Sequence, residues 1–130
     1  MKLVNCIMLV DDNKIDNFFH ERVIQKYDPQ IKTVAKTMAE DALGYLSSEV
    51  TIPDIIILDI NMPGMNGWEF IDHYKTLNAS LQNSLIVVML SSGQPDDFAL
   101  AKTQGILHDF KSKPLTIKAL EEIIAKYQSN

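Results

Sequence analysis

The chain has 130 residues, of which 46% are hydrophobic and 22% are charged, and its formal net charge is −5. This length and composition are typical of one globular domain with its own core, so residues 1–130 are interpreted as a single domain. Because Lys and Arg form no run, the acidic balance argues against nucleic acid or an anionic membrane as a partner.

The amino terminus, MKLVNCIMLVDD, is similar to a short signal peptide, but it ends in two acids where a cleavage site requires small residues. We therefore interpret residues 6–10 as a first strand. Cys6 is the only cysteine, so no internal disulfide is possible, and we expect it to be a small buried hydrophobic residue. No apolar stretch approaches the length of a membrane span, and we expect a cytoplasmic protein.

Short apolar runs alternate along the chain with segments of helical periodicity. The predicted strands are residues 6–10, 31–35, 55–58, 85–90 and 108–112. The first predicted helix has apolar residues at helical spacing, and we expect them to face the core: Ile15, Phe18, Phe19, Val23 and Tyr27.

Capping signals delimit the later helices. Thr37 followed by Glu40 predicts a capping box at the second helix. Pro95 suits a first helical turn and Gly105 a helix end, and Thr116 is predicted to cap the last helix. The third helix is predicted from its inward face, which is Phe70, Ile71, Tyr74 and Leu77.

Five rounds of strand and helix predict an α/β fold with a parallel sheet and helices on both faces. Three of the strands lack polar alternation, as strands buried on both sides require. The pattern alone does not determine the strand order. The flavodoxin-like, doubly wound order 2-1-3-4-5 with five helices is the obvious candidate.

Polar residues gather at the predicted strand ends. In an open parallel sheet, ligands bind beyond the carboxyl ends of the strands, so residues distant in sequence become neighbours there. The residues at these ends are Asp11, Asp12, Asp59, Ser91, Ser92 and Lys113.

Three carboxylates at one edge require compensating charge. Two of them about 4 Å apart repel by roughly 4 kcal/mol at an effective dielectric constant near 20. Lys113 supplies one positive charge, and a divalent cation would supply the rest. Oxygen ligands without a Cys/His cluster favour a hard ion, and few carboxylates with room for water favour Mg²⁺. A carboxylate beside Mg²⁺ and a lysine is equipped to attack phosphorus.

Four motifs together resemble the receiver domain of two-component response regulators. They are LVDDN at 9–13, LDINMPGMNG at 58–67, VVMLSSG at 87–93 and KSKP at 111–114. Each motif alone is a weak signal, but four in this order and spacing are specific, and the resemblance covers essentially the whole chain.

The resemblance implies a role for each matching residue. Asp59 would be the phosphoacceptor, Asp12 a direct Mg²⁺ ligand and Asp11 a ligand mainly through water. Asn61 would offer its backbone carbonyl to the metal, and Lys113 would bind the phosphoryl group.

The resemblance also covers the switching residues. Ser91 stands at the family's switch Ser/Thr, and Lys113–Pro114 at its cis peptide bond. Phe110 replaces a switch aromatic that is often Tyr, so no hydroxyl hydrogen bond takes part in switching here. Family experience further implies that Asn61 and Gly93 help to tune the lifetime of the phosphorylated state.

The implied function is a phosphorylation switch fed by a sensor histidine kinase rather than an enzyme. Phosphorylation would change the face made by the fourth predicted helix, the fifth strand and the fifth predicted helix. The expected partners are a downstream protein target, a histidine phosphotransfer protein or a second copy of the chain through that face. Because only three residues follow Tyr127, we expect a stand-alone receiver.

Two alternatives belong to other functional classes. A Mg²⁺-dependent phosphohydrolase of the haloacid-dehalogenase type needs a second acid two residues after its nucleophile, but Asn61 stands there, and an amide cannot transfer the proton. The other alternative is a receiver-like interaction module that no longer accepts phosphate, and the intact set of Asp59, Ser91 and Lys113 argues against it. Three histidines do not cluster as metal ligands, namely His20, His73 and His108.

Overall fold

The structure, a computed structural model, describes residues 2–48, 51–92, 95–103 and 105–130. Within these residues, strands and helices alternate along the chain. The strands are β1 (Cys6–Val10), β2 (Lys32–Lys36), β3 (Ile55–Asp59), β4 (Ile86–Ser91) and β5 (Asp109–Ser112). The helices are α1 (Lys14–Tyr27), α2 (Ala39–Ser48), α3 (Gly67–Tyr74), α4 (Ala79–Ser84), α5 (Pro95–Ala101) and α6 (Ile117–Ser129).

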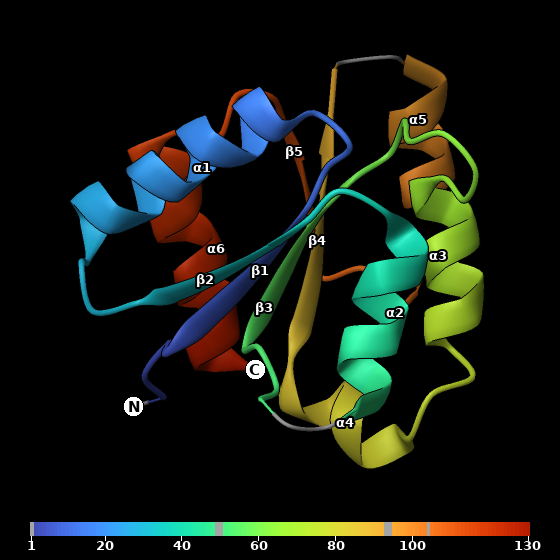
Figure 1. Cartoon of the computed structure of the whole chain (residues 1–130), viewed down its shortest axis with the longest axis horizontal. Helices are drawn as coiled ribbons and strands as arrows, with labels where there is room; N and C mark the ends of the chain where they lie inside the picture. The colour runs from blue at the N-terminus through green and yellow to red at the C-terminus, as the bar shows by residue number, and fades with distance from the viewer. Residues whose placement is uncertain (1, 49–50, 93–94, 104) are drawn as a thin grey trace.

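The five strands form one parallel sheet in the order β2-β1-β3-β4-β5, which confirms the expected doubly wound topology. Helices α1 and α6 cover one face of the sheet, and α2, α3 and α5 lie on the other (Figure 1). The described residues contain six helices, so the prediction of five was wrong. The additional helix, α4, has six mostly polar residues, which is too short a run for helical periodicity to be recognised.

The central strands contribute to two hydrophobic cores. In β3, Ile55 and Ile57 pack with residues of α1 and α6, whereas Ile56 and Leu58 pack with residues of α2 and α3. Successive side chains of a strand point to opposite faces, so a central strand covered on both faces has no exposed positions that would be polar. Cys6 in β1 is buried, as expected.

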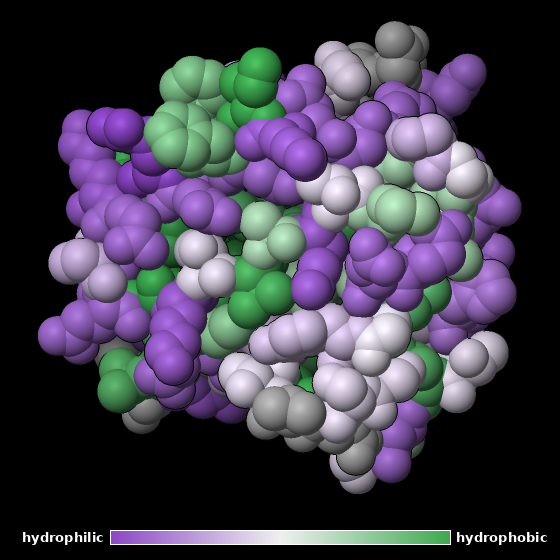
Figure 2. All heavy atoms as spheres, viewed as in Figure 1, coloured by the Kyte–Doolittle hydropathy of each residue, from purple (hydrophilic) through white to green (hydrophobic). Residues whose placement is uncertain are grey.

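The side of α1 that faces the core is not the predicted one. Ile15, Phe18 and Phe19 are 64%, 54% and 57% exposed, and Tyr27 is also exposed. Instead of these residues, α1 buries the following three: Asn17, His20 and Ile24. The prediction of an inward apolar stripe was therefore wrong for these four residues, but it was right for Val23, which is half-buried and packs against the core. Figure 2 shows a hydrophobic patch over α1 at the surface.

A buried polar anchor explains this orientation of α1. The Asn17 Nδ2 donates hydrogen bonds to the backbone oxygens of Asp11 at 3.0 Å and Lys36 at 3.4 Å. These carbonyls follow β1 and end β2, so one amide joins two strand ends to the helix. Lys36 O also accepts from Asp11 N at 3.0 Å. Since a buried carbonyl that loses its donor is costly, the bond to Asp11 O is the one that favours burial of the polar side of the helix over burial of the phenylalanines.

The helix boundaries differ from the prediction at two places. The capping box predicted at Thr37 was wrong, because α2 begins at Ala39. A capping box occurs instead at α3, where Asn66 and Glu69 exchange side-chain-to-backbone hydrogen bonds. Thr116 caps α6, as predicted.

Helix α5 ends at Ala101, before the predicted end at Gly105. None of the helices in the described ranges combines the length and the apolarity that crossing a bilayer requires.

Candidate functional site

The carboxyl ends of the strands bring the predicted residues to one edge of the sheet. Asp11 and Asp12 follow β1, Asp59 ends β3, Ser91 ends β4, and Lys113 follows β5. The parallel register aligns these ends, since Val10 pairs with Leu58, Asp59 with Leu90, and Ser91 with Ser112.

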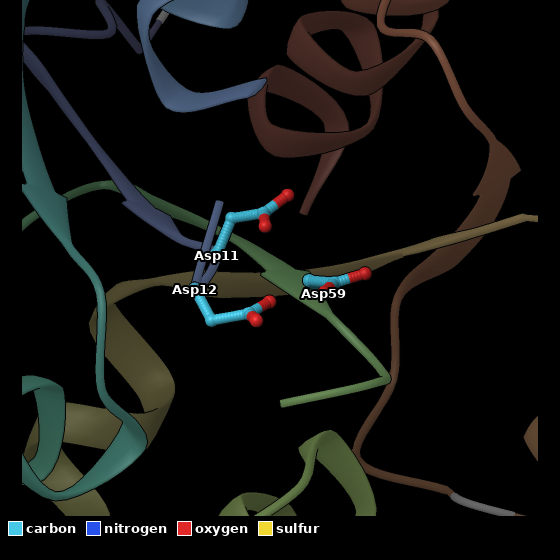
Figure 3. A group of neighbouring side chains, drawn as sticks. All are labelled: Asp11, Asp12 and Asp59. Atoms are coloured by element: carbon cyan, nitrogen blue, oxygen red, sulfur yellow. The ribbon is translucent and has the colours of Figure 1, made fainter. Parts of the chain in front are cut away.

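Three carboxylates form a cluster at this edge. One ligand oxygen from each of Asp11, Asp12 and Asp59 lies within 4.8 Å of the others. Figure 3 shows the three side chains extending toward the same side from the ends of β1 and β3. Asp11 and Asp59 are buried, whereas Asp12 is exposed. Since like charges at this distance repel more strongly where burial reduces solvation, as at Asp11 and Asp59, cations beside the cluster stabilise it.

Lys113 is the cation that the chain itself supplies. Its Nζ lies 2.8 Å from Asp11 Oδ2, 3.0 Å from Asp16 Oδ2 and 3.1 Å from Asp59 Oδ1. An ammonium has three N–H donors, so each carboxylate matches one of them. Asp16 was not among the site residues predicted from the sequence. The available signal was an acid in the first turn of the helix that follows Asp12.

The surroundings raise the pKa of Asp59 from its ordinary value of 3.8 to about 6. Burial is the largest cause, followed by the charge of Asp11, and Lys113 offsets only part of this effect. Burial lowers the pKa of Lys113, but its hydrogen bonds to Asp11 and Asp16 and the charge of Asp59 outweigh burial and raise the pKa overall. The amine is therefore protonated at neutral pH, and one positive charge does not balance the acids.

This charge deficit and the oxygen donors fit a hard divalent cation. The three clustered residues offer carboxylate oxygens only, which is the donor chemistry that Mg²⁺ prefers. Asn61 lies in the turn after β3, two residues beyond Asp59, and its side chain is exposed. Asp11, Asp12 and Asp59 are thus residues that could hold such a cation.

The turn after β3 folds back onto Asp59. Gly67 N donates to Ile60 O at 2.8 Å, which closes the turn. A Cβ on Gly67 would lie 2.7 Å from the backbone oxygen of Asp59 and 2.9 Å from Ile60 Cα. Gly64, inside the turn, has φ of 77°, which favours glycine. The glycines of the MPGMNG segment therefore permit the close approach that positions the acid.

We expect Gly67→Ala to destabilise the protein by about 1–3 kcal/mol, because a methyl group there must displace backbone atoms. Urea unfolding measures this change. The matched control is Gly44→Ala in α2, where an added Cβ meets nothing within 4 Å. That substitution should be neutral or stabilise by about 0.5–1 kcal/mol, since alanine is the better helix former. Equal midpoints for the two variants would contradict the close packing at Gly67.

Ser91 supplies a buried hydroxyl at the end of β4. Its Oγ donates to Asp97 Oδ2 at 3.4 Å, a long hydrogen bond to the first turn of α5. Asp97 was not among the site residues predicted from the sequence. Ser92 is exposed, and Gly93 lies outside the residues that the structure describes.

Phe110 lies on β5 and is half-buried. Its ring contacts the ring of Phe98 edge to face, with centroids 5.4 Å apart and planes at 89°. A cavity of about 140 Å³ adjoins these two rings. The Lys113–Pro114 peptide bond, which follows β5, is cis.

The arrangement provides the parts of a phosphoryl-accepting centre. A buried carboxylate can act as nucleophile, a lysine beside it can neutralise phosphoryl oxygens, and a nearby hydroxyl can donate a hydrogen bond. The residues come from four separate strand ends and from the first turns of α1 and α5, and only the fold brings them together.

Comparison with known proteins identifies the family of the chain. The family model for the response regulator receiver domain matches residues 7–125. Sporulation initiation phosphotransferase F of Bacillus subtilis is 28% identical over 121 residues, which cover 93% of this chain and 91% of that protein. The heme response regulator HssR of Staphylococcus haemolyticus is 29% identical over 133 residues, which cover 98% of this chain. The chain spans 54% of HssR, and thus only about half of that relative's length.

Solved structures match over almost the whole length. A two-component response regulator from Cytophaga hutchinsonii has a TM-score of 0.88 at 34% identity, covering 99% of this chain and 100% of that one. A response regulator receiver protein from Dyadobacter fermentans has a TM-score of 0.85 at 28% identity, with coverage of 95% and 97%. The chain therefore belongs to the family of response regulator receiver domains.

Proposed function

We propose that the protein is a phosphoacceptor switch of a two-component phosphorelay, in which Asp59 takes a phosphoryl group from the phosphohistidine of a sensor histidine kinase. The observation that carries this proposal is the contact of Lys113 with buried Asp59 inside the acidic cluster, 3.1 Å between Nζ and Oδ1. A lone buried acid would be expected to take up a proton. An acid held beside an ammonium and a cation site is suited to attack phosphorus.

In the transfer step, an Asp59 oxygen forms a bond to phosphorus while the bond from phosphorus to the donor imidazole breaks. The electron pair of the broken bond stays on the imidazole nitrogen. Lys113 neutralises charge on the phosphoryl oxygens, and the Ser91 hydroxyl donates a hydrogen bond to one of them. Positioning and electrostatic stabilisation supply the catalysis, as is usual for phosphoryl transfer.

Mg²⁺ is the proposed metal of the site. Asp12 would hold it directly, Asp11 mainly through water, Asp59 through its carboxylate and Asn61 through its backbone carbonyl. When bound, the ion adds the positive charge that Lys113 alone does not supply and neutralises phosphoryl oxygens.

We also propose how the switch is read. The Ser91 hydroxyl would turn toward the phosphoryl group, and Phe110 would repack beside Phe98. Three elements would then shift between two packings with different partner affinity, namely α5, β5 and α6. They correspond to the fourth helix, the fifth strand and the fifth helix that the sequence predicts. A downstream protein, a histidine phosphotransfer protein or a second copy of the chain would bind this face, in the cytoplasm and without nucleic acid.

The exposed side of α1 supports docking of the phosphodonor. Phe18 and Phe19 are more than half exposed, and a groove of about 880 Å³ runs between Phe19 on α1 and Pro114–Leu115. Pro114 directly follows Lys113, so this groove adjoins the acidic cluster. An apolar surface beside a reactive centre is typical of a binding site rather than of an unused face.

Incubation with acetyl phosphate and Mg²⁺, followed by intact-mass measurement, tests the proposal. We expect a single phosphoryl adduct that does not form when EDTA removes the metal. An unmodified chain without metal affinity would favour the inert interaction module. Steady release of phosphate from simple phosphate esters would favour the phosphohydrolase.

A further inference from the structure

The carboxylate of Asp16 contacts Lys113 but is not part of the acidic cluster. Its Oδ2 accepts a hydrogen bond from Lys113 Nζ at 3.0 Å. Asp16 comes from the first turn of α1, and the group of acids that could hold a metal consists of Asp11, Asp12 and Asp59 only, within the described residues. Asp16 thus acts on the site through Lys113.

The helix cap fixes the backbone that carries this carboxylate. Asn13 is the N-cap residue of α1, and its Oδ1 accepts from the backbone nitrogens of Ile15 at 2.9 Å and Asp16 at 3.3 Å. Asn13 N in turn donates to Asp11 Oδ1 at 2.9 Å. The start of α1 is therefore tied to the acidic cluster, and Asp16 is held within reach of Lys113.

The three contacts of Lys113 differ in how readily water can replace them. The side chains of Asp11 and Asp59 are 5% and 7% exposed, whereas that of Asp16 is 35% exposed. Breaking a buried pair leaves an uncompensated charge and costs several kcal/mol, but a partly exposed carboxylate is solvated when its partner leaves. Of the three contacts of Lys113, the hydrogen bond to Asp16 is therefore the one that a phosphoryl oxygen can replace at the lowest free-energy cost.

We propose that Asp16 is a positioning residue that occupies one N–H of Lys113 in the unphosphorylated protein, gives it up to the phosphoryl group, and so restrains phosphoryl uptake. No proton changes its bonded atom in this exchange. One hydrogen bond of the ammonium passes from Asp16 Oδ2 to a phosphoryl oxygen, and water solvates the carboxylate. This inference rests on the proposed function of Asp59.

The test compares Asp16→Asn with wild type and with Glu21→Gln, which removes one negative charge elsewhere on α1. We expect Asp16→Asn to raise the initial rate of adduct formation from acetyl phosphate and Mg²⁺ about two- to five-fold, as loss of a partly exposed charge pair permits. Asp16→Glu, which keeps a carboxylate at this position, should restore a rate close to that of wild type. Glu21→Gln should not change the rate.

A second readout uses the metal-free protein. If Asp16 shields Lys113, then Asp16→Asn should raise the rate at which an amine-reactive ester acylates Lys113, measured by peptide mass spectrometry. The rate at Lys111, which pairs with Glu122 at 3.0 Å, should stay unchanged and serves as the internal control. Circular dichroism checks that each variant is folded.

Unchanged uptake in Asp16→Asn, or an equal rise in Glu21→Gln, would overturn the inference while leaving the proposed function intact. Unchanged acylation of Lys113 would overturn it as well. A wild-type protein that forms no adduct would overturn the proposed function itself, and this inference with it.

Discussion

Asp59→Asn is expected to abolish the phosphoryl adduct that wild type forms with acetyl phosphate and Mg²⁺. The amide that replaces the carboxylate is not a nucleophile toward phosphorus, and Lys113 and the other acids cannot substitute for it. Intact mass after a fixed incubation gives the result, and the adduct should fall to the level of protein that was never exposed to the donor. Asp72→Asn is the matched control, since Asp72 is exposed on α3 and should leave the adduct unchanged.

The same variant should fold normally and resist urea better than wild type at neutral pH without metal. Removing one of three clustered negative charges relieves repulsion in a buried site, and the remaining carboxylates keep Lys113 as their partner. If Asp59→Asn still took up a phosphoryl group, fragment masses would locate it on a neighbouring acid, and Asp59 would not be the nucleophile.

The stability of the metal-free protein is expected to fall as pH rises from about 4 to about 6. The folded pKa of Asp59 is raised to about 6 from 3.8, because burial and the charge of Asp11 disfavour ionisation. In this interval the folded protein binds a proton that the unfolded chain has already lost, so raising the pH favours unfolding. The loss is on the order of 2–3 kcal/mol and persists above the folded pKa.

Urea unfolding of wild type and of Asp59→Asn, in EDTA and from about pH 4 to about pH 6, isolates the effect of the Asp59 carboxyl. The other acids titrate in both proteins, so their contributions cancel in the difference. The difference in unfolding free energy between the two proteins should grow with pH and then level off. Parallel stability curves for the two proteins would contradict the raised pKa of Asp59.

Mg²⁺ at pH 7.5 should stabilise wild type, by about 2.7 kcal/mol at a concentration one hundred times the dissociation constant.

Strand positions and the site edge could be predicted because they follow from local regularities. The apolar run at residues 55–58 and the acid that follows it required no knowledge of neighbours. The structure extends this strand by one residue, to Asp59, and pairs it in parallel with β1 and β4. The short helix α4 was missed because a mostly polar run of six residues has no periodic pattern to recognise.

The orientation of α1 could not be predicted from periodicity. The spacing of Phe18 and Phe19 indicated an inward stripe, yet both lie at the surface, because Asn17 binds the carbonyls at two strand ends. Hydrophobic periodicity describes one helix at a time, whereas hydrogen bonds to buried carbonyls depend on where other strands end. Of the two exposed phenylalanines, Phe19 lines the groove proposed for the phosphodonor.

The amino-acid sequence by itself determined the alternation of strands and helices, and with it the set of acids, hydroxyls and lysine at the strand ends. Carboxyl ends of parallel strands meet at one edge whatever the details of packing. Only the tertiary structure decided that Lys113 also binds Asp16 and that Ser91 contacts Asp97. Both acids come from helices, and the rotation of a helix against the sheet depends on contacts between distant segments, which local sequence patterns do not encode.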